Sequence, residues 1–236
     1  TAMYLATSSA TGQTVTAAGL FGSFAGGAVA GAVSVIATPL AGTIDVITLE
    51  GAGITLREHR PEDLEAVHRW HGDHEVMKYL SWGADTLEES LLYLADCIRD
   101  RRKPRRDRYR LAIELPDGVV AGCAAIHWRG RGHSGGDGRL GCFLARDYQG
   151  RGIARDATRL LIGFGFGDLG MHRISATCLE GNTRSRRALQ DLGFVYEGTM
   201  RSHSSRDGRW LDRHFYSLLK EEWGRGEQKR PINVKA

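Results

Sequence analysis

The sequence lacks the cysteine patterns that hold metal ions or disulfide frameworks. Its four cysteines are irregularly spaced and none belongs to a C-x-x-C pair: Cys97, Cys123, Cys142 and Cys178. Zinc sites and disulfide-stabilised folds both need closely defined cysteine spacings. We therefore expect reduced thiols, no metal site and a cytoplasmic protein.

The first part of the chain lacks charge. No acidic or basic residue occurs from Thr1 to Ile44, and alanine and glycine dominate residues 17–37. The missing basic flanks argue against a signal peptide or an oriented membrane span, and the glycines weaken any helix there. The pattern favours a flexible or loosely packed extension. Added strands, an oligomerisation element and a membrane anchor through residues 17–37 remain alternatives.

The composition changes near residue 50, and the whole chain has 42% hydrophobic and 25% charged residues, as globular proteins do. We predict an uncharged Ala/Gly-rich extension over residues 1–52, a domain over 53–224 and a tail over 225–236. The net charge of +4 is mildly basic. The basic run Arg101–Arg110 predicts a solvated loop rather than a nucleic-acid surface, because only Tyr109 could stack on bases.

Strand and helix signals alternate through the predicted domain. The strongest local signals are the capping sequence Thr86–Glu89 before a helix and the turn Pro116–Gly118 within a β-hairpin. The predicted order is β-α-α-β-β-β-α-β-α-β-β. This order indicates an α/β (α+β) fold with a mixed, mostly antiparallel central sheet flanked by helices. The predicted strands are 54–57, 109–115, 119–128, 140–144, 173–178, 194–202 and 213–219, and the helices are 61–70, 86–100, 153–169 and 182–192.

The segment Leu140–Ala154 has the features of an anion-binding turn. A buried strand is followed by Gln149-Gly150-Arg151-Gly152-Ile153-Ala154, where a helix begins. The first amides of a helix have no internal partners and carry the positive end of its dipole, so a diphosphate suits this place. A P-loop lysine is absent, and Arg155 stands where a dinucleotide fingerprint needs a small residue.

Three blocks in order resemble the GNAT superfamily, and specifically its RimJ/RimL-like branch of ribosomal-protein and N-terminal acetyltransferases. The Q-G-R-G-I-A stretch matches the pyrophosphate motif [QR]-x-x-G-x-[GA]. The second block shows N-x-x-S from Asn182 to Ser185, then L-G-F and E-G. The third, Gly208–Asp212 with Tyr216, is similar to the closing hairpin of the branch. Residues 1–50 lie outside the resemblance.

The resemblance implies that acetyl-CoA is the co-substrate and that a strand bulge opens the sheet beside it. The main chain of Phe143 and Leu144 would then hold the pantetheine arm, and Asn182 and Ser185 would face the cofactor near its sulfur. The diphosphate would be held by the turn itself: Gln149, Gly150, Arg151, Gly152, Ile153 and Ala154.

The implied catalytic residues are Ser185, His203 and Asn182. Ser185 would supply the proton or hydrogen bond to the leaving thiolate, although a hydroxyl on a helix surface also bonds locally. Many members of the branch have a glutamate at the position aligned with Ser204, and here that acid is missing. His203 titrates near neutrality and could act as the base. An exposed strand histidine is the alternative.

The acceptor implied by the resemblance is a primary amine, most readily the N-terminal α-amine of a protein or peptide. An α-amine has a pKa of about 8 and loses its proton more easily than lysine. A small-molecule amine and a non-catalytic acyl-CoA-binding regulator are the alternatives. A homodimer is possible, and neither nucleic acid nor membrane is an expected partner.

Overall fold

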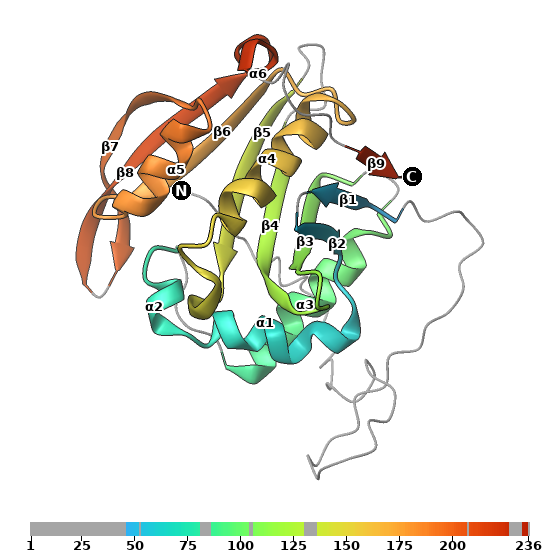
Figure 1. The fold of residues 1–236 in the computed structure, drawn as a ribbon. Coiled ribbons are helices and arrows are strands. Elements are labelled where there is room, and N and C mark those ends of the chain that lie inside the picture. The colour runs from blue at the N-terminus through green and yellow to red at the C-terminus, as the bar shows by residue number, and fades with distance from the viewer. Residues whose placement is uncertain are drawn as a thin grey trace, which may run out of the picture. The chain divides into compact units, whose positions relative to one another are not determined.

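A single mixed sheet with helices on both faces organises the domain (Figure 1). The structure, a computed structural model, describes residues 46–51, 53–80, 86–103, 106–129, 136–206, 208–226 and 233–235. The interpretations of residues 17–37 lie outside these ranges. Within the described residues, no helix combines the length and the apolar character needed to cross a lipid bilayer.

The predicted strand and helix order is confirmed, with short elements added to it. The helices are α1 (Leu64–His71), α2 (His74–Met77), α3 (Leu87–Asp100), α4 (Ile153–Phe166), α5 (Thr183–Asp191) and α6 (Lys220–Gly226). The strands are β1 (Thr48–Gly51), β2 (Ile54–Glu58), β3 (Arg108–Glu114), β4 (Val120–Arg129), β5 (Asp137–Leu144), β6 (Arg173–Leu179), β7 (Val195–Arg206), β8 (Arg209–Leu219) and β9 (Asn233–Lys235). The sequence had not predicted β1, α2, α6 or β9.

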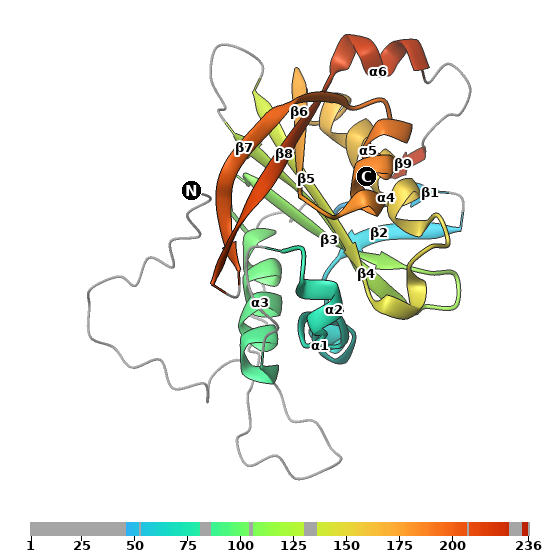
Figure 2. The ribbon, with the colours of Figure 1, turned by 90° about the vertical axis from the view of Figure 1, so that its left-hand side faces the viewer.

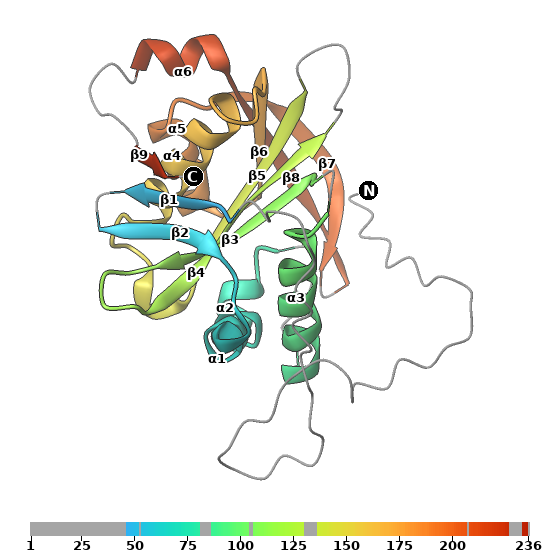
Figure 3. The same cartoon turned by 90° about the vertical axis from the view of Figure 1, so that its right-hand side faces the viewer.

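The strands follow the order β7-β8-β6-β5-β4-β3-β2-β1-β9 in the part of the sheet that the structure describes. Neighbouring strands are antiparallel except β5 and β6, which are parallel. The predicted α/β fold with a mostly antiparallel sheet is therefore confirmed. Seen from two sides, α4 and α5 lie on one face and α1 to α3 on the other (Figures 2 and 3).

The sheet extends beyond the predicted domain limits of 53–224. Strand β1 lies within the predicted extension and β9 within the predicted tail, and they pair with each other. Leu49 of β1 is 1% exposed and belongs to the main core. The described residues from 46 to 235 belong to one compact unit. The domain limits inferred from composition exclude β1 and β9, because such short strands leave no change in composition.

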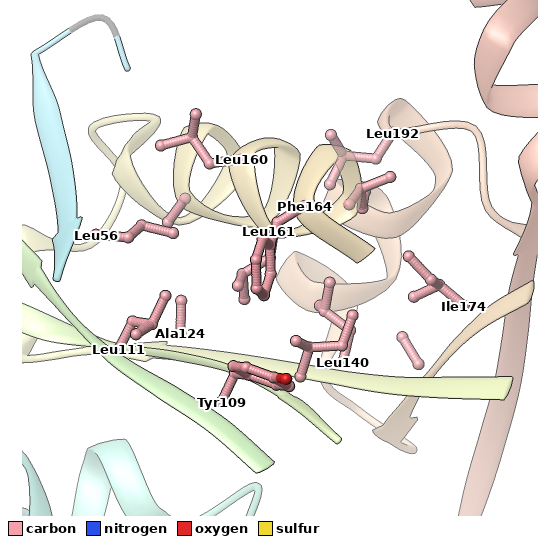
Figure 4. Close-up of a cluster of buried hydrophobic side chains, with 14 of the residues drawn as sticks. Leu56, Tyr109, Leu111, Ala124, Leu140, Leu160, Leu161, Phe164, Ile174 and Leu192 are labelled. Carbon is pink, nitrogen blue, oxygen red and sulfur yellow. The ribbon is translucent and has the colours of Figure 1, made fainter. Parts of the chain in front are cut away.

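The main core lies between α4 and the sheet (Figure 4). Leu160, Leu161 and Phe164 recur at helical spacing and are buried there, as the sequence predicted. They contact side chains from alternate positions of the strands, among them Leu111 and Leu140. The residues between these positions face α1 and α3.

The opposite face holds a smaller core under α1 and α3. Trp70 of α1 and Leu94 of α3 are fully buried against Ala112 and Cys123 of the sheet. Helix α3 begins with the predicted capping box, in which Thr86 and Glu89 bond reciprocally. The helices on this face are therefore fixed by local caps and by burial.

The basic run Arg101–Arg110 is only in part the solvated loop that was predicted: Arg102 and Lys103 are exposed, but later arginines are buried. Arg106 is buried, and its terminal nitrogens lie 2.5 and 3.0 Å from the Glu58 carboxylate. Arg110 is also buried and donates to Asp100 at 2.6 Å. A buried guanidinium needs an acidic partner, and Glu58 is too distant in sequence for a local pattern to reveal it.

Candidate active site

Strands β5 and β6 separate part of the way along their length (Figure 1). They pair from Asp137↔Arg173 to Leu140↔Ala176. Beyond these pairs, β5 continues beside β4 to Leu144 and β6 continues beside β8 to Leu179. We call the region between residues 141–144 of β5 and 177–179 of β6 the fork.

The fork forms without the strand bulge that the resemblance had implied. The register of β4 with β5 is continuous from Gly122↔Leu144 to Arg129↔Asp137. Bulges interrupt such a register by one residue. The divergence therefore arises because the two strands follow different partners.

Main-chain groups of Cys142 and Leu144 point into the fork. The amide of Ala145 donates to the Ala121 carbonyl at 2.9 Å, which fixes the alternation of the β4–β5 ladder. The main-chain N–H and C=O groups of Phe143 therefore point to β4. In agreement, a Cβ added to Gly122 of β4 would lie 2.2 Å from the carbonyl oxygen of Phe143. The predicted role of Leu144 fits this geometry. The main-chain groups of Phe143, for which the same role is predicted, are directed to β4 instead, whereas those of Cys142 are directed to the fork.

The turn before α4 presents main chain to open space. Gly150 and Gly152 adopt φ values of 77° and 82°, and a Cβ at either position would meet no atom within 4 Å. A residue with a side chain would be strained there. The amides of Arg155 and Asp156 bond to the Gly152 carbonyl. The amides of Ile153 and Ala154 stand at the positive end of the helix dipole.

Side chains near the turn hold it in place. Gln149 donates to the Leu144 carbonyl at 3.1 Å, so its amide ties the turn to the end of β5. The guanidinium of Arg151 lies 5.6 Å from the centre of the Tyr148 ring. Arg146 donates to both carboxylate oxygens of Asp73, at 2.7 and 3.2 Å. The Gln149 side chain therefore helps to fix the turn.

Helix α5 begins on the same face as the turn, beyond β6. The side-chain oxygen of Asn182 accepts a hydrogen bond from the Ser185 amide at 3.1 Å and caps the helix. Ser185 is half-buried in the first turn. Asn182 and Ser185 thus lie at the end of the strand that forms the second side of the fork.

His203 and Ser204 lie on the opposite face, where α1 to α3 pack. The register of β7 with β8 shifts between Met200 and Ser204, and Ser202 adopts a φ of 47°. Asp212 accepts a hydrogen bond from the Ser202 amide at 2.8 Å. At this shift in register, the centre of the His203 ring lies 5.9 Å from that of the Phe215 ring. Nδ1 of His203 lies 3.2 Å from the Ser204 hydroxyl oxygen.

Two arginines that sequence reasoning missed meet at the fork on this face. Arg139 of β5 and Arg213 of β8 both donate to the Thr177 hydroxyl, at 3.0 and 3.1 Å. Arg213 also donates to Ser204 at 3.0 Å. Strand alternation was the signal available: Arg139 and Phe143 share a face of β5, opposite the buried Leu140 and Leu144.

Electrostatics at the fork favour neutral groups. Burial, followed by the charges of Arg213 and Arg139, lowers the pKa of His203. Burial raises the pKa of the Cys142 thiol to about 12 and also raises that of Cys178. Both thiols therefore stay protonated at neutral pH. A protonated thiol is a poor nucleophile, so this chemistry disfavours an acyl-enzyme on either cysteine.

Two surface hollows lie elsewhere on the described structure. One, of about 460 Å³, is lined by residues of β2, of the α1 region and of the β3–β4 connection, such as Arg57, Arg69 and Val120. The other, of about 320 Å³, is lined by Arg186, Gln190, Tyr196, His214 and Tyr216. Neither includes a predicted site residue. The candidate site is therefore defined by the fork, the turn and α5.

Comparisons with known proteins agree with this geometry. The family model described as acetyltransferase (GNAT) domain matches residues 54–195. YdaF from Bacillus subtilis, whose name marks it as a candidate ribosomal N-acetyltransferase, is 29% identical over 178 residues, covering 72% of this chain and 93% of its own. The spermidine N1-acetyltransferase of Escherichia coli is 26% identical over 147 residues, covering 62% of this chain and 75% of its own.

A solved structure shows the same fold. RimJ of Mycobacterium smegmatis, in complex with CoA-disulfide, superposes with a TM-score of 0.65 at 26% identity and covers 76% of this chain and 90% of its own. The family match spans more than half of the chain and includes the fork, the turn before α4 and the start of α5. The chain therefore belongs to the GNAT acetyltransferase family, and it is an N-acetyltransferase.

Proposed function

We propose that the protein transfers the acetyl group of acetyl-CoA to the N-terminal α-amine of a protein or peptide, as a RimJ/RimL-like enzyme. The main support is the position of the turn before α4 beside the fork. Open amides at a helix N-terminus suit the diphosphate, and the main-chain groups of Cys142 and Leu144 suit the amide-rich pantetheine arm. The YdaF and RimJ relatives support the RimJ/RimL-like assignment.

The residues on the α4 face bind the cofactor. Amides between Gly150 and Ala154 hold the diphosphate, and Arg151 adds positive charge beside it. Main-chain groups of Cys142 and Leu144 align the thioester along β5. An N–H group in the fork polarises the thioester carbonyl, which is a large contribution to acyl transfer.

The amine attacks the thioester directly in a ternary complex. His203 lies on the face opposite Asn182 and Ser185, so base and leaving-group residues stand on different sides of the fork. The lowered pKa of His203 keeps it neutral and able to accept a proton at neutral pH. Ser185, positioned by the Asn182 cap, donates a hydrogen bond to the departing thiolate.

A small-molecule amine is the second candidate acceptor. It is supported by the similarity to spermidine N1-acetyltransferase. The α-amine is favoured because its pKa of about 8 leaves more neutral amine at pH 7 than an ordinary primary alkylamine has. A cytoplasmic location and a homodimer stay predictions.

A thiol-release screen tests the proposal. Peptides that vary in their first residue are compared with polyamines and aminoglycosides, products are identified by mass, and calorimetry measures CoA binding. We expect products acetylated at the peptide N-terminus. Products from polyamines alone would favour the second candidate, and absence of CoA binding would contradict the proposed site.

Variants separate the catalytic roles. Ser185→Ala should lower kcat while leaving the affinity for CoA nearly unchanged. His203→Ala should lower the rate most at the acid end of the pH–rate profile, and Ser204→Glu should supply an alternative base. If His203→Ala keeps the full rate at every pH, His203 is not the base.

A further inference from the structure

The short helix α2 lies between the end of the β7–β8 hairpin and the segment that follows β5 (Figure 1). It consists of residues His74–Met77 alone. A single helical turn has too few hydrogen bonds to be stable by itself, so the position of α2 depends on the side chains that anchor it. Val76 and Met77 are buried, and an arginine from another segment binds each end of the helix.

The N-terminal end of α2 is tied to the segment after β5. The Asp73 carboxylate caps α2 by accepting a hydrogen bond from the Glu75 amide at 2.8 Å. The same carboxylate accepts two hydrogen bonds from Arg146, at 2.7 and 3.2 Å. The bonds from Arg146 lower the pKa of Asp73, so both groups are charged at neutral pH. Arg146 stands between β5 and the turn before α4, and the contact therefore joins α2 to the cofactor side of the site.

The C-terminal end of α2 is tied to the β7–β8 hairpin. Arg206 of β7 donates to the main-chain oxygens of Met77 and Leu80, at 2.5 and 3.1 Å. Both bonds come from one terminal nitrogen of a half-buried side chain. Hydrogen bonds from a charged donor are stronger than those between neutral groups. The end of the hairpin is thereby fixed to α2.

The part of the hairpin that Arg206 fixes also carries His203. After the shift in register, β7 and β8 pair regularly from Ser204↔Leu211 to Arg206↔Arg209. His203 directly precedes this regular stretch. A displacement of the stretch therefore moves His203 as well, and α2 connects its position to that of the segment after β5.

We propose that Arg146 and Arg206 are positioning residues, which act through α2 to hold His203 in place relative to β5. The inference rests on the proposed function, in which His203 accepts the proton of the amine. Neither arginine has to touch the acceptor or CoA. Placement matters because a base must lie within hydrogen-bond distance of the proton that it removes, and a displacement of about 1 Å can lower a rate by about 100-fold.

Arg206 variants test the contact at the C-terminal end of α2. Arg206→Met keeps the length of the side chain and removes its donors. We expect kcat for a peptide acceptor to fall by about tenfold, while the Kd for CoA, measured by calorimetry, changes by less than about twofold. Arg206→Lys keeps the charge and a donor, and it should restore most of the rate.

Asp73→Asn tests the contact at the N-terminal end. Asparagine caps a helix as well as aspartate does, but it lacks the charge that binds Arg146. We expect kcat to fall by about three- to fivefold, the size expected for the loss of one exposed ion pair. Arg146→Gln should have the same effect, and the double variant should lose no more than either single one, because the two residues form one contact.

Lys78→Gln is the matched control for these variants. It breaks an ion pair with Glu75 that lies on α2 itself, and the Lys78 side chain is 43% exposed. The pair joins α2 to neither neighbouring segment. The control should therefore leave both kcat and the Kd for CoA unchanged.

The His203→Ala background separates positioning from a purely structural role. If the arginines act on the rate through His203, Arg206→Met and Asp73→Asn should each lower kcat by less than about twofold in this background. An equal loss of kcat with and without His203 overturns the inference, and so does an unchanged kcat in both variants. N-terminal acetylation stands in either case. If Arg206→Met no longer binds CoA, the milder Asp73→Asn decides.

A different result removes the basis of the inference. Full activity of His203→Ala at every pH shows that the base assignment in the proposed function is wrong, and the inference fails with it. The single variant His203→Ala therefore reports on the proposed function, and the arginine variants report on the positioning.

Discussion

Replacing Gly152 with alanine tests whether the turn before α4 binds phosphate. Gly152 has a φ of 82° and open space around its Cβ position. An alanine there stores about 1–2 kcal/mol of strain, and relief of that strain would shift the amides that follow Gly152. Losing one charge-assisted hydrogen bond of about 1.5–3 kcal/mol should weaken CoA binding by about 10- to 100-fold.

Gly118→Ala is the matched control. Gly118 has a φ of 81° and equally open space, but it lies in the β3–β4 turn, away from the fork. Both variants should therefore lose similar thermal stability, whereas only Gly152→Ala should lose affinity in calorimetric titration with CoA. Equal CoA affinity in the two variants would refute the assignment of the phosphate site.

Three further predictions concern stability. Leu161→Ala should lower the free energy of unfolding by about 3 kcal/mol in urea titrations, because Leu161 is 0% exposed under α4; a loss below about 1 kcal/mol would contradict the described core. Asn182→Ala should cost about 1 kcal/mol through the lost cap, and Asn182→Ser should keep most of it. His127 has a pKa of about 4 when folded against 6.5 for an ordinary histidine. The unfolded chain therefore binds more protons between these values, and stability should fall by up to about 3 kcal/mol as the pH drops through them. His127→Gln should remove that loss, and an unchanged acid profile would show that His127 is not responsible.

Local signals made much of the fold predictable. The capping box at Thr86, the cap at Asn182 and the glycine turn before α4 each involve residues within a few positions of one another. The apolar spacing of α4 gives its buried face in the same way. These elements could be assigned because their physical causes lie within one short stretch of sequence.

Features set by distant residues could not be predicted. β1 and β9 are recognisable as strands only through their pairing with each other and with β2. Arg106 is buried because it meets Glu58. The convergence of Arg139 and Arg213 on Thr177 depends on three strands, so neither arginine stands out in the sequence.

The segments of the candidate site were predictable, but the directions of their main-chain groups were not. The motif located the turn and the strand before it. The register of β4 with β5 was needed to show that the main chain of Cys142, and not that of Phe143, is directed to the fork. The sequence also placed Gln149 at the turn, while only the structure ties its amide to Leu144.

The short parallel pairing of β5 with β6 has a mechanical consequence. Hydrogen bonds join the two parts of the sheet, β1–β5 with β9 and β6–β8, from Asp137↔Arg173 to Leu140↔Ala176. A cofactor bound in the fork, as proposed, would contact both parts beyond the last of these pairs. Its binding energy would then add to the cohesion of the sheet, so the free and cofactor-bound proteins would differ in how independently the two parts move.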